Sequence, residues 1–240
     1  MMKLKLLNQT MFLWTIIGLL LVILLVNWYY LASPAFFYLR HVDIHWAGYT
    51  REKLVALTFD DGPDPRFTPE ILEILKENHI PATFFVLGKN VRKYPEIVKE
   101  ELRLGHEIGN HTYDHQHLNK LTTNEINQEL VKTDRVMKRV TGRISHIFRP
   151  PYEELDEPIL VSTREQEKEM ILSTITLEHS SYSCEAEVSR VMQKVFPGAI
   201  ILAHDGRLNR SETVEALPLL IQALEVKGYK IVSLKQLLGK

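Results

Sequence analysis

Cysteine is almost absent from this sequence of 240 residues, in which Cys184 stands alone. A single cysteine cannot form an internal disulfide, and it cannot supply a thiolate cage for zinc. Any metal in this chain must therefore be held by histidine and carboxylate side chains.

An excess of either charge is absent too. Lys and Arg number 29, Asp and Glu number 30, and no dense basic stretch occurs, so the electrostatic surface that nucleic-acid binding needs is missing. Glycine- and serine-rich linkers and internal repeats are also missing. The length suits one large α/β domain with a short appendage, and no feature of the sequence identifies a protein partner.

Charged side chains are missing between Lys5 and Arg40, and residues 11–30 are almost wholly apolar. About 20 apolar residues can span a bilayer, and the preceding lysines favour a cytoplasmic N-terminus. The sequence therefore predicts a single-pass cell-membrane protein with a cytoplasmic segment at 1–10, a transmembrane anchor at 11–32, a juxtamembrane connector at 33–50 and an extracytoplasmic domain at 51–240. The alternatives are a buried core helix and a cleaved signal peptide, whose apolar region is usually only about 7 to 15 residues long.

Short apolar runs alternate with amphipathic stretches after residue 50. The runs predict strands at 54–59, 82–87, 106–109, 146–149, 171–177, 199–203 and 230–233. The amphipathic stretches predict helices at 69–78, 91–104, 122–140, 185–195 and 212–227, whereas the polar piece 155–169 is placed only weakly. Thr122 and Glu125 have the spacing of a capping box. Apolar strands that alternate with helices indicate a parallel sheet covered on both faces.

Polar residues gather just after the predicted strands. They are Asp60 and Asp61 after the first strand, His111 and His115 after the third, Arg149 at the end of the fourth, and His204 and Asp205 after the sixth. In a closed or nearly closed barrel these side chains converge at the C-terminal mouth. A doubly wound open sheet is the alternative, and it would gather its binding residues at one switch point.

Two adjacent aspartates, Asp60 and Asp61, follow a strand that is expected to be buried. Unpaired carboxylates resist desolvation, so a cation is expected nearby. Neighbouring strand residues point to opposite faces, so both carboxylates can enter one site only if the chain turns, which Gly62-Pro63 favours. A surface turn is the simpler alternative.

His111 and His115 have a spacing that brings both rings to one metal if the segment is helical. Considered alone, such a cluster is more often a solvated loop. With Asp61 as a third ligand, the set leaves an open coordination position, which is typical of a catalytic zinc site. Chemistry there also needs a base, an acid and an oxyanion donor.

Four motifs occur along the chain: Thr-Phe-Asp-Asp-Gly-Pro at 58–63, His-Thr-Tyr-Asp-His at 111–115, Arg-Pro-Pro-Tyr at 149–152 and Leu-Ala-His at 202–204. In these motifs and their order the chain resembles the polysaccharide deacetylase family, also called the NodB-homology or carbohydrate esterase 4 family. The likeness covers nearly all of the domain at 51–240. It implies an α/β fold, a distorted (β/α) barrel of about seven parallel strands, preceded here by the transmembrane helix. It also implies a hydrolase that removes N-acetyl groups from cell-wall polysaccharide such as peptidoglycan or a chitin-like glycan.

The resemblance assigns the metal site and the base. Asp61, His111 and His115 hold a divalent metal, usually zinc. Asp60 acts as the general base toward the attacking water. Arg149 orients Asp60, although taken alone it could equally form a surface ion pair.

The resemblance also assigns the remaining half of the site. The Tyr152 backbone amide helps to stabilise the oxyanion, and His204 protonates the leaving amine. Leu202 lines the acetyl pocket, and Pro151 and Tyr152 contact the substrate. A strand leucine considered alone is far more often part of the core.

The sequence departs from the family pattern at two places. Glu153 stands where the family usually has glycine, and Thr176 stands where it has an aspartate that supports the catalytic histidine. Threonine cannot stabilise a protonated imidazole with charge, and Glu153 or Glu178 would have to replace the aspartate. Weakened acid catalysis with intact metal binding is therefore expected. A weakened glycan-binding protein, or a related ester or amide hydrolase, remains the alternative function.

Overall fold

The computed structural model describes residues 2–31, 42–177 and 183–240, with side chains in the first range from 14 to 28. The chain divides into two units, Met1–His41 and Val42–Lys240. The first unit contains helix α1 (Met2–Leu31). The second contains the described strands and every residue predicted for the site.

The predicted transmembrane anchor at 11–32 is wrong. None of the helices in the described part of the chain combines the length and apolar character that a membrane crossing requires. The predicted single-pass localisation with a cytoplasmic N-terminus is wrong with it, and anchoring to a membrane through this helix is not supported. Residues 33–41 of the predicted connector lie outside the described residues.

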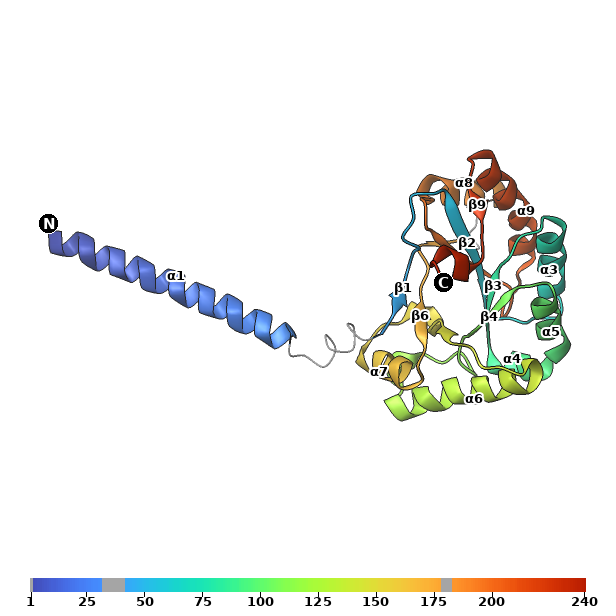
Figure 1. Cartoon of the computed structure of the whole chain (residues 1–240), viewed down its shortest axis with the longest axis horizontal. Helices are drawn as coiled ribbons and strands as arrows, with labels where there is room; N and C mark the ends of the chain where they lie inside the picture. The colour runs from blue at the N-terminus through green and yellow to red at the C-terminus, as the bar shows by residue number, and fades with distance from the viewer. Residues whose placement is uncertain (1, 32–41, 178–182) are drawn as a thin grey trace. The chain divides into compact units, whose positions relative to one another are not determined.

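Strands and helices alternate along the second unit (Figure 1). The strands are β1 (Ile44–His45), β2 (Leu54–Asp60), β3 (Thr83–Val86), β4 (Glu107–Asn110), β5 (Ile147–Phe148), β6 (Glu169–Ile171), β7 (Ile175–Thr176), β8 (Ile200–His204) and β9 (Lys230–Ile231). The helices are α3 (Thr68–Glu77), α4 (Gly88–Lys93), α5 (Pro95–Arg103), α6 (Thr123–Thr141), α7 (Glu157–Glu165), α8 (Cys184–Lys194), α9 (Ser211–Val226) and α10 (Leu234–Leu237). Two short 3-10 helices, η1 (Leu118–Lys120) and η2 (Pro151–Glu153), lie in the loops.

The named strands form one sheet in the order β1-β6-β5-β4-β3-β2-β8-β7, with β9 beside β2. Every pairing between them is parallel. The predicted strand 171–177 is in fact two strands, because β6 pairs with β1 and β5 whereas β7 pairs with β8 at the far edge. Only residues 172–174 join β6 to β7, so the two strand ends lie within roughly 14 Å of each other. The sheet therefore curls into a half-barrel and does not close.

Local sequence signals explain most helix boundaries. Thr122 and Glu125 form the predicted capping box at the start of α6, and Gly142 ends that helix with φ 81°. The helix predicted at 91–104 is split into α4 and α5, because Pro95 begins a new helix and the preceding residue Tyr94 leaves the helical conformation. Helix α7 falls in the weakly placed polar piece, where Asp156 caps it through the Ile159 amide.

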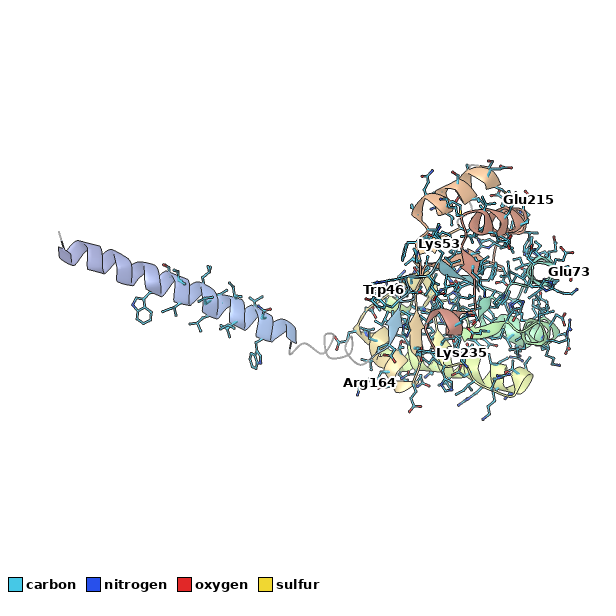
Figure 2. The ribbon with its side chains drawn as sticks, turned by 45° about the horizontal axis from the view of Figure 1, so that its top comes forward. Trp46, Lys53, Glu73, Arg164, Glu215 and Lys235 are labelled. Carbon is cyan, nitrogen blue, oxygen red and sulfur yellow. The ribbon has the colours of Figure 1, made fainter. Side chains whose placement is uncertain are left out.

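Alternation along β2 decides which side chains enter the half-barrel. Val55, Leu57 and Phe59 pack outward with apolar residues of α3, α5, α8 and α9, so Ala56, Thr58 and Asp60 point to the opposite, inner face. The inner core is small and contains Phe85, Ile171, Ile200 and residues of α10. Charged side chains such as Glu73 and Glu215 project from the outer helices into solvent (Figure 2). The polar side chains at the end of the inner face are therefore available for an active site.

Candidate active site

A cavity of about 270 Å³ lies at the C-terminal ends of the strands. It is lined by Asp60, Asp61, His111, His115, Tyr152, Glu153, Thr176, Leu202, His204, Arg207 and Arg210. Of the nine residues predicted for the site, Arg149 and Pro151 are buried beside the cavity and do not line it. A larger hollow of about 570 Å³ lies at the opposite ends of the strands and contains none of the predicted residues.

Strand register places Asp60, the predicted base, next to His204, the predicted acid. Asp60 at the end of β2 is the direct partner of His204 at the end of β8, so both side chains point to the inner face. Leu202 precedes His204 by two residues on that face, and Thr176 of β7 is its direct partner. Leu202 is only 6% exposed, so it serves both the core and the cavity wall.

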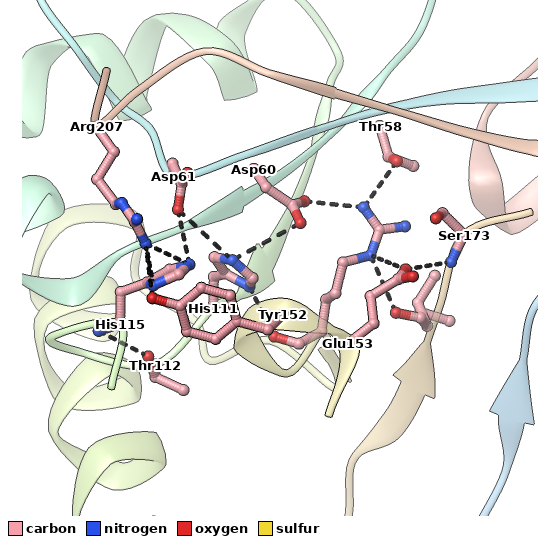
Figure 3. Close-up of polar contacts among 12 residues, drawn as sticks. Thr58, Asp60, Asp61, His111, Thr112, His115, Tyr152, Glu153, Ser173 and Arg207 are labelled. Atoms are coloured by element: carbon pink, nitrogen blue, oxygen red, sulfur yellow. Dashed lines mark hydrogen bonds and ion pairs between the residues drawn. The ribbon is translucent and has the colours of Figure 1, made fainter. Parts of the chain in front are cut away.

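Asp61 is brought to the same site as Asp60 by a turn, as the sequence predicts. Its backbone has φ 79°, a left-handed conformation that reverses the strand alternation. The side-chain amide of Asn90 donates from Nδ2 to the Asp61 backbone carbonyl at 2.9 Å, and Arg210 Nη2 donates to Asp61 Oδ2 at 3.3 Å. The other oxygen, Oδ1, lies 3.0 Å from His115 Nε2. Arg210 therefore holds Oδ2 and leaves Oδ1 for the histidines. Figure 3 shows the Asp61 carboxylate facing His111 and His115.

The two histidines converge without a helix, so the helical spacing expected for them is wrong. Residues 111–117 form a loop, in which Thr112 and His115 have φ 67° and 62°. The Thr112 amide donates to the Asn110 side chain at 2.9 Å. Helix α6 holds the next turn, because Glu129 Oε2 accepts the amides of Tyr113 and Asp114 at 3.0 and 2.8 Å. Left-handed backbone conformations and side-chain hydrogen-bond acceptors, and not a helix, therefore orient the two histidine rings.

His111 has a defined tautomer. Its Nδ1 lies 2.7 Å from the Arg149 carbonyl oxygen, which can only accept, so Nδ1 carries the proton. Nε2 is left with a free lone pair and lies 3.8 Å from Asp61 Oδ1. Burial lowers the pKa of His111 to about 3, so the ring stays neutral at physiological pH. A neutral imidazole held by a carbonyl behind it is the usual form of a metal-binding histidine.

The three predicted ligands fit a metal ion. One ligand atom from each of Asp61, His111 and His115 lies within 4.8 Å of the other two. A tetrahedral ion with ligands at about 2.0 to 2.2 Å requires separations of roughly 3.3 to 3.6 Å, close to the 3.0 and 3.8 Å measured to Asp61 Oδ1. That oxygen is also buried without a hydrogen-bond donor among the described residues. Since an orphaned carboxylate oxygen needs a cation, the donor set suits a divalent metal.

Arg149 fixes the position of Asp60. The guanidinium is fully buried and donates from Nη1 to Asp60 Oδ1 and Thr58 Oγ1, both at 2.8 Å, and from Nε to the Ile171 carbonyl at 3.1 Å. Burial raises the pKa of Asp60, and the charge of Arg149 opposes that rise. A carboxylate with one oxygen fixed in this way presents the other to the cavity. The alternative of a surface ion pair for Arg149 is excluded, because its side chain is buried.

Glu153 adopts the conformation that the usual glycine would adopt more easily. Tyr152 and Glu153 have φ 59° and 52°, in the left-handed region that disfavours side chains with Cβ. Glu153 Oε1 accepts the Ser173 amide and lies 3.9 Å from Arg149 Nε. Its carboxylate therefore sits against the Arg149 side of the site and is not placed against His204.

His204 has little support of its own. Burial lowers the pKa of His204 to about 4, which the nearby Asp60 carboxylate only partly opposes. Its ring makes no hydrogen bond with the described residues, and neither does the Thr176 hydroxyl. The Thr176 backbone carbonyl accepts from Arg190 Nη2 at 2.6 Å. Glu178, the other carboxylate expected to replace the family aspartate, lies outside the described residues.

The sequence prediction missed two arginines in the loop after β8. Arg210 donates to Asp61, and Arg207 lies against the His115 ring, with Nη1 at 3.1 Å from Nε2. Arg207 Nη1 also lies 3.5 Å from the Tyr152 hydroxyl. Asp205, which the sequence placed after the same strand, is buried behind the cavity, where it accepts the Thr68 hydroxyl at 2.6 Å. Extending the His204 motif by six residues would have found both arginines.

Comparisons with known proteins identify the family of this chain. A family model described as polysaccharide deacetylase matches residues 47–171. A peptidoglycan-N-acetylglucosamine deacetylase of Bacillus cereus is 41% identical over 184 residues, which make up 75% of this chain and 66% of that protein. A second protein of that name from Bacillus cereus is 31% identical and is covered over 92% of its length. A chitooligosaccharide deacetylase of Sinorhizobium fredii is 35% identical over 76% of this chain and 90% of its own.

Solved structures show the same fold. The Bc1960 peptidoglycan N-acetylglucosamine deacetylase superposes with a TM-score of 0.79 at 36% identity, covering 85% of this chain and 96% of that one. BA3943 of Bacillus anthracis, described as a pseudoenzyme of the same CE4 family, gives 0.75 at 31% identity over 81% and 68%. These two structural neighbours therefore differ in their descriptions: one is called a deacetylase and the other a pseudoenzyme.

Proposed function

Because this chain belongs to the polysaccharide deacetylase family, we propose that it is a metal-dependent hydrolase that removes N-acetyl groups from cell-wall polysaccharide. The enzyme class predicted from the motifs is confirmed by relatives named as N-acetylglucosamine and chitooligosaccharide deacetylases. The chain spans about two thirds of the first of these relatives. The observation that carries the proposal is the Asp61, His111 and His115 cluster with Asp60 beside it.

The residues around this cluster suit amide hydrolysis. A divalent metal, for which zinc is our proposal, supplies a Lewis acid that polarises the acetyl carbonyl and acidifies water. Asp60, fixed by Arg149 and 3.7 Å from His111 Nε2, takes the proton of the attacking water. The Tyr152 amide, at the left-handed turn that borders the cavity, donates to the developing oxyanion.

The acetyl group and the leaving amine belong on the β8 side of the cavity. Leu202 presents an apolar wall to the acetyl methyl, and Tyr152 borders the sugar. The predicted substrate residue Pro151 is buried next to Tyr152 and supports the turn from behind. His204 is the one imidazole in the cavity outside the metal set, and it faces Asp60 across the strand pair. It delivers the proton to the departing amine nitrogen.

Acetate release from N-acetylated glycan tests the proposal. The full chain is loaded with zinc and incubated with chitotetraose and with peptide-free peptidoglycan strands, and free acetate and bound metal are measured. Release from at least one glycan, lost on chelation and restored by metal, is expected. Full metal occupancy with no acetate from either glycan would exclude the deacetylase.

One observation favours a second candidate function. His204 has no carboxylate partner among the described residues and a lowered pKa, so it is mostly unprotonated at neutral pH. A protein with this site could bind metal and glycan and turn over slowly, as a weakened glycan-binding member of the family. Glycan binding at micromolar affinity with turnover that does not change in His204→Ala would favour it over the enzyme.

A further inference from the structure

Arg207 is the cation of the active-site cavity that lacks a charge partner. Each cavity carboxylate already has a guanidinium: Asp61 has Arg210 at 3.3 Å, and Asp60 and Glu153 share Arg149 at 2.8 and 3.9 Å. Arg207 forms no ion pair with any carboxylate in the described parts of the chain. With a divalent metal bound, the cavity therefore carries an excess of positive charge on the Arg207 side.

The free edge of this guanidinium has the geometry for a carboxylate. Nη1 is directed to the His115 ring and the Tyr152 hydroxyl, whereas Nε and Nη2 make no hydrogen bond with the described residues. Nε and Nη2 lie on the same edge of the guanidinium and can donate together to the two oxygens of one carboxylate. The Arg207 side chain is exposed, so this edge is open to solvent.

The loop that carries Arg207 is held in place. Arg207 has φ 70°, a conformation that costs energy in any residue with a Cβ. Gly206 packs against Asp61 so closely that a Cβ would lie 2.3 Å from the Asp61 carbonyl oxygen, and Arg210 Nε donates to the Gly206 carbonyl at 2.8 Å. The strained arginine is thus anchored to the metal ligand on one side and to helix α9 on the other.

The two ends of the cavity differ in charge. Arg207 lies at the His115 end, whereas Glu153 lies at the Ser173 end (Figure 3). An anionic substituent is attracted to the first end and repelled from the second.

We propose that Arg207 is a specificity-determining residue that binds a carboxylate carried by the glycan substrate. This inference rests on the proposed function, in which the substrate is N-acetylated cell-wall polysaccharide. The carboxylate has two sources in such a polymer: the lactyl group of a muramic acid unit without its peptide, or the free carboxylates of a peptide stem. A neutral chitin-like glycan offers neither.

Equilibrium binding tests the inference without requiring turnover. Three tetrasaccharides are titrated into zinc-loaded Asp60→Asn protein with and without Arg207→Gln: neutral chitotetraose, a peptide-free strand with lactyl carboxylates, and the same strand with peptide stems. We expect one or both charged strands to bind about tenfold more tightly than chitotetraose, and Arg207→Gln to remove that difference, which corresponds to about 1.4 kcal/mol. Arg207→Lys should restore part of it, and 0.5 M salt should reduce it.

The outcomes separate the inference from the proposed function. Equal affinity for all three glycans, or a charge preference that survives Arg207→Gln, overturns the inference. A preference lost equally in Arg103→Gln, a surface change on α5, also overturns it. Acetate release is measured in parallel on the protein that keeps Asp60. This measurement tests the proposed deacetylase activity and is independent of the binding affinities.

Discussion

The two halves of the active site are supported very differently. The metal half has a brace behind every ligand: Arg210 on Asp61, the Arg149 carbonyl on His111, and Thr112 with Glu129 on the loop of His115. The acid half consists of His204 on its strand, next to a threonine. Several contacts fix the geometry of each predicted ligand, whereas no hydrogen bond with the described residues fixes the His204 ring. The difference predicts a protein that binds metal well and releases its amine product slowly.

The largest effect is expected from Asp60, the proposed base, which lies next to the predicted metal ligand Asp61. Asp60→Asn keeps the shape and removes the proton acceptor, so acetate release should fall by about 10²- to 10⁴-fold. Bound zinc should stay the same, because Asp60 is not a predicted ligand. The matched control Asp43→Asn, on an exposed side chain, should leave both unchanged. A loss of zinc in Asp60→Asn would show that Asp60 and Asp61 do not have separate roles.

The next change weakens the brace of the metal half. Glu129→Gln replaces the carboxylate that accepts the Tyr113 and Asp114 amides with a weaker acceptor, so zinc affinity should fall about 10- to 100-fold. Competition with a chelator measures the affinity. Glu73→Gln on the surface of α3 is the control. Unchanged affinity would mean that the loop holds its shape without α6.

The third change repairs the acid half. Thr176→Asp places a carboxylate on the inner face near His204 and should raise the pKa of His204 above about 4. A general acid works in its protonated form, so the descending limb of the pH profile should move to higher pH. Turnover at pH 7 should rise roughly tenfold for each unit of that shift. Thr176→Asn adds a similar shape without the charge, and a profile that moves equally in both variants would show that charge is not what His204 lacks.

The smallest expected effect concerns Tyr152. If its backbone amide is the oxyanion donor, Tyr152→Phe removes only a hydroxyl that lies 3.5 Å from Arg207, and kcat should change less than about threefold. A larger loss of kcat with unchanged KM would move the role from the backbone to the side chain.

Much of this molecule could be predicted from its sequence because the signals are local. The capping box at Thr122 and the strand that ends at Asp60 depend on neighbouring residues. The three predicted metal ligands were found because each lies in a short motif that follows a strand. What could not be predicted depends on distant ones. The break between β6 and β7 follows from pairing at opposite edges of the sheet, and the aim of His115 follows from Glu129 on another element. The transmembrane prediction is overturned by the described helices, none of which combines the length and apolar character of a membrane span.

Helix α6 has a consequence for folding. Glu129 holds the loop of the two histidines, and Asp134, paired with Lys168, holds Asn110 at its base. The loop of His111 and His115 therefore takes its shape against this helix, and undocking of the helix removes its contacts with that loop. Metal that binds only when the helix is docked stabilises the docked state. The stabilisation is about 2.7 kcal/mol when the metal concentration is a hundred times its dissociation constant. Amide hydrogens of α6 should exchange more slowly as zinc is added, so the helix reports occupancy of a site that it does not itself line.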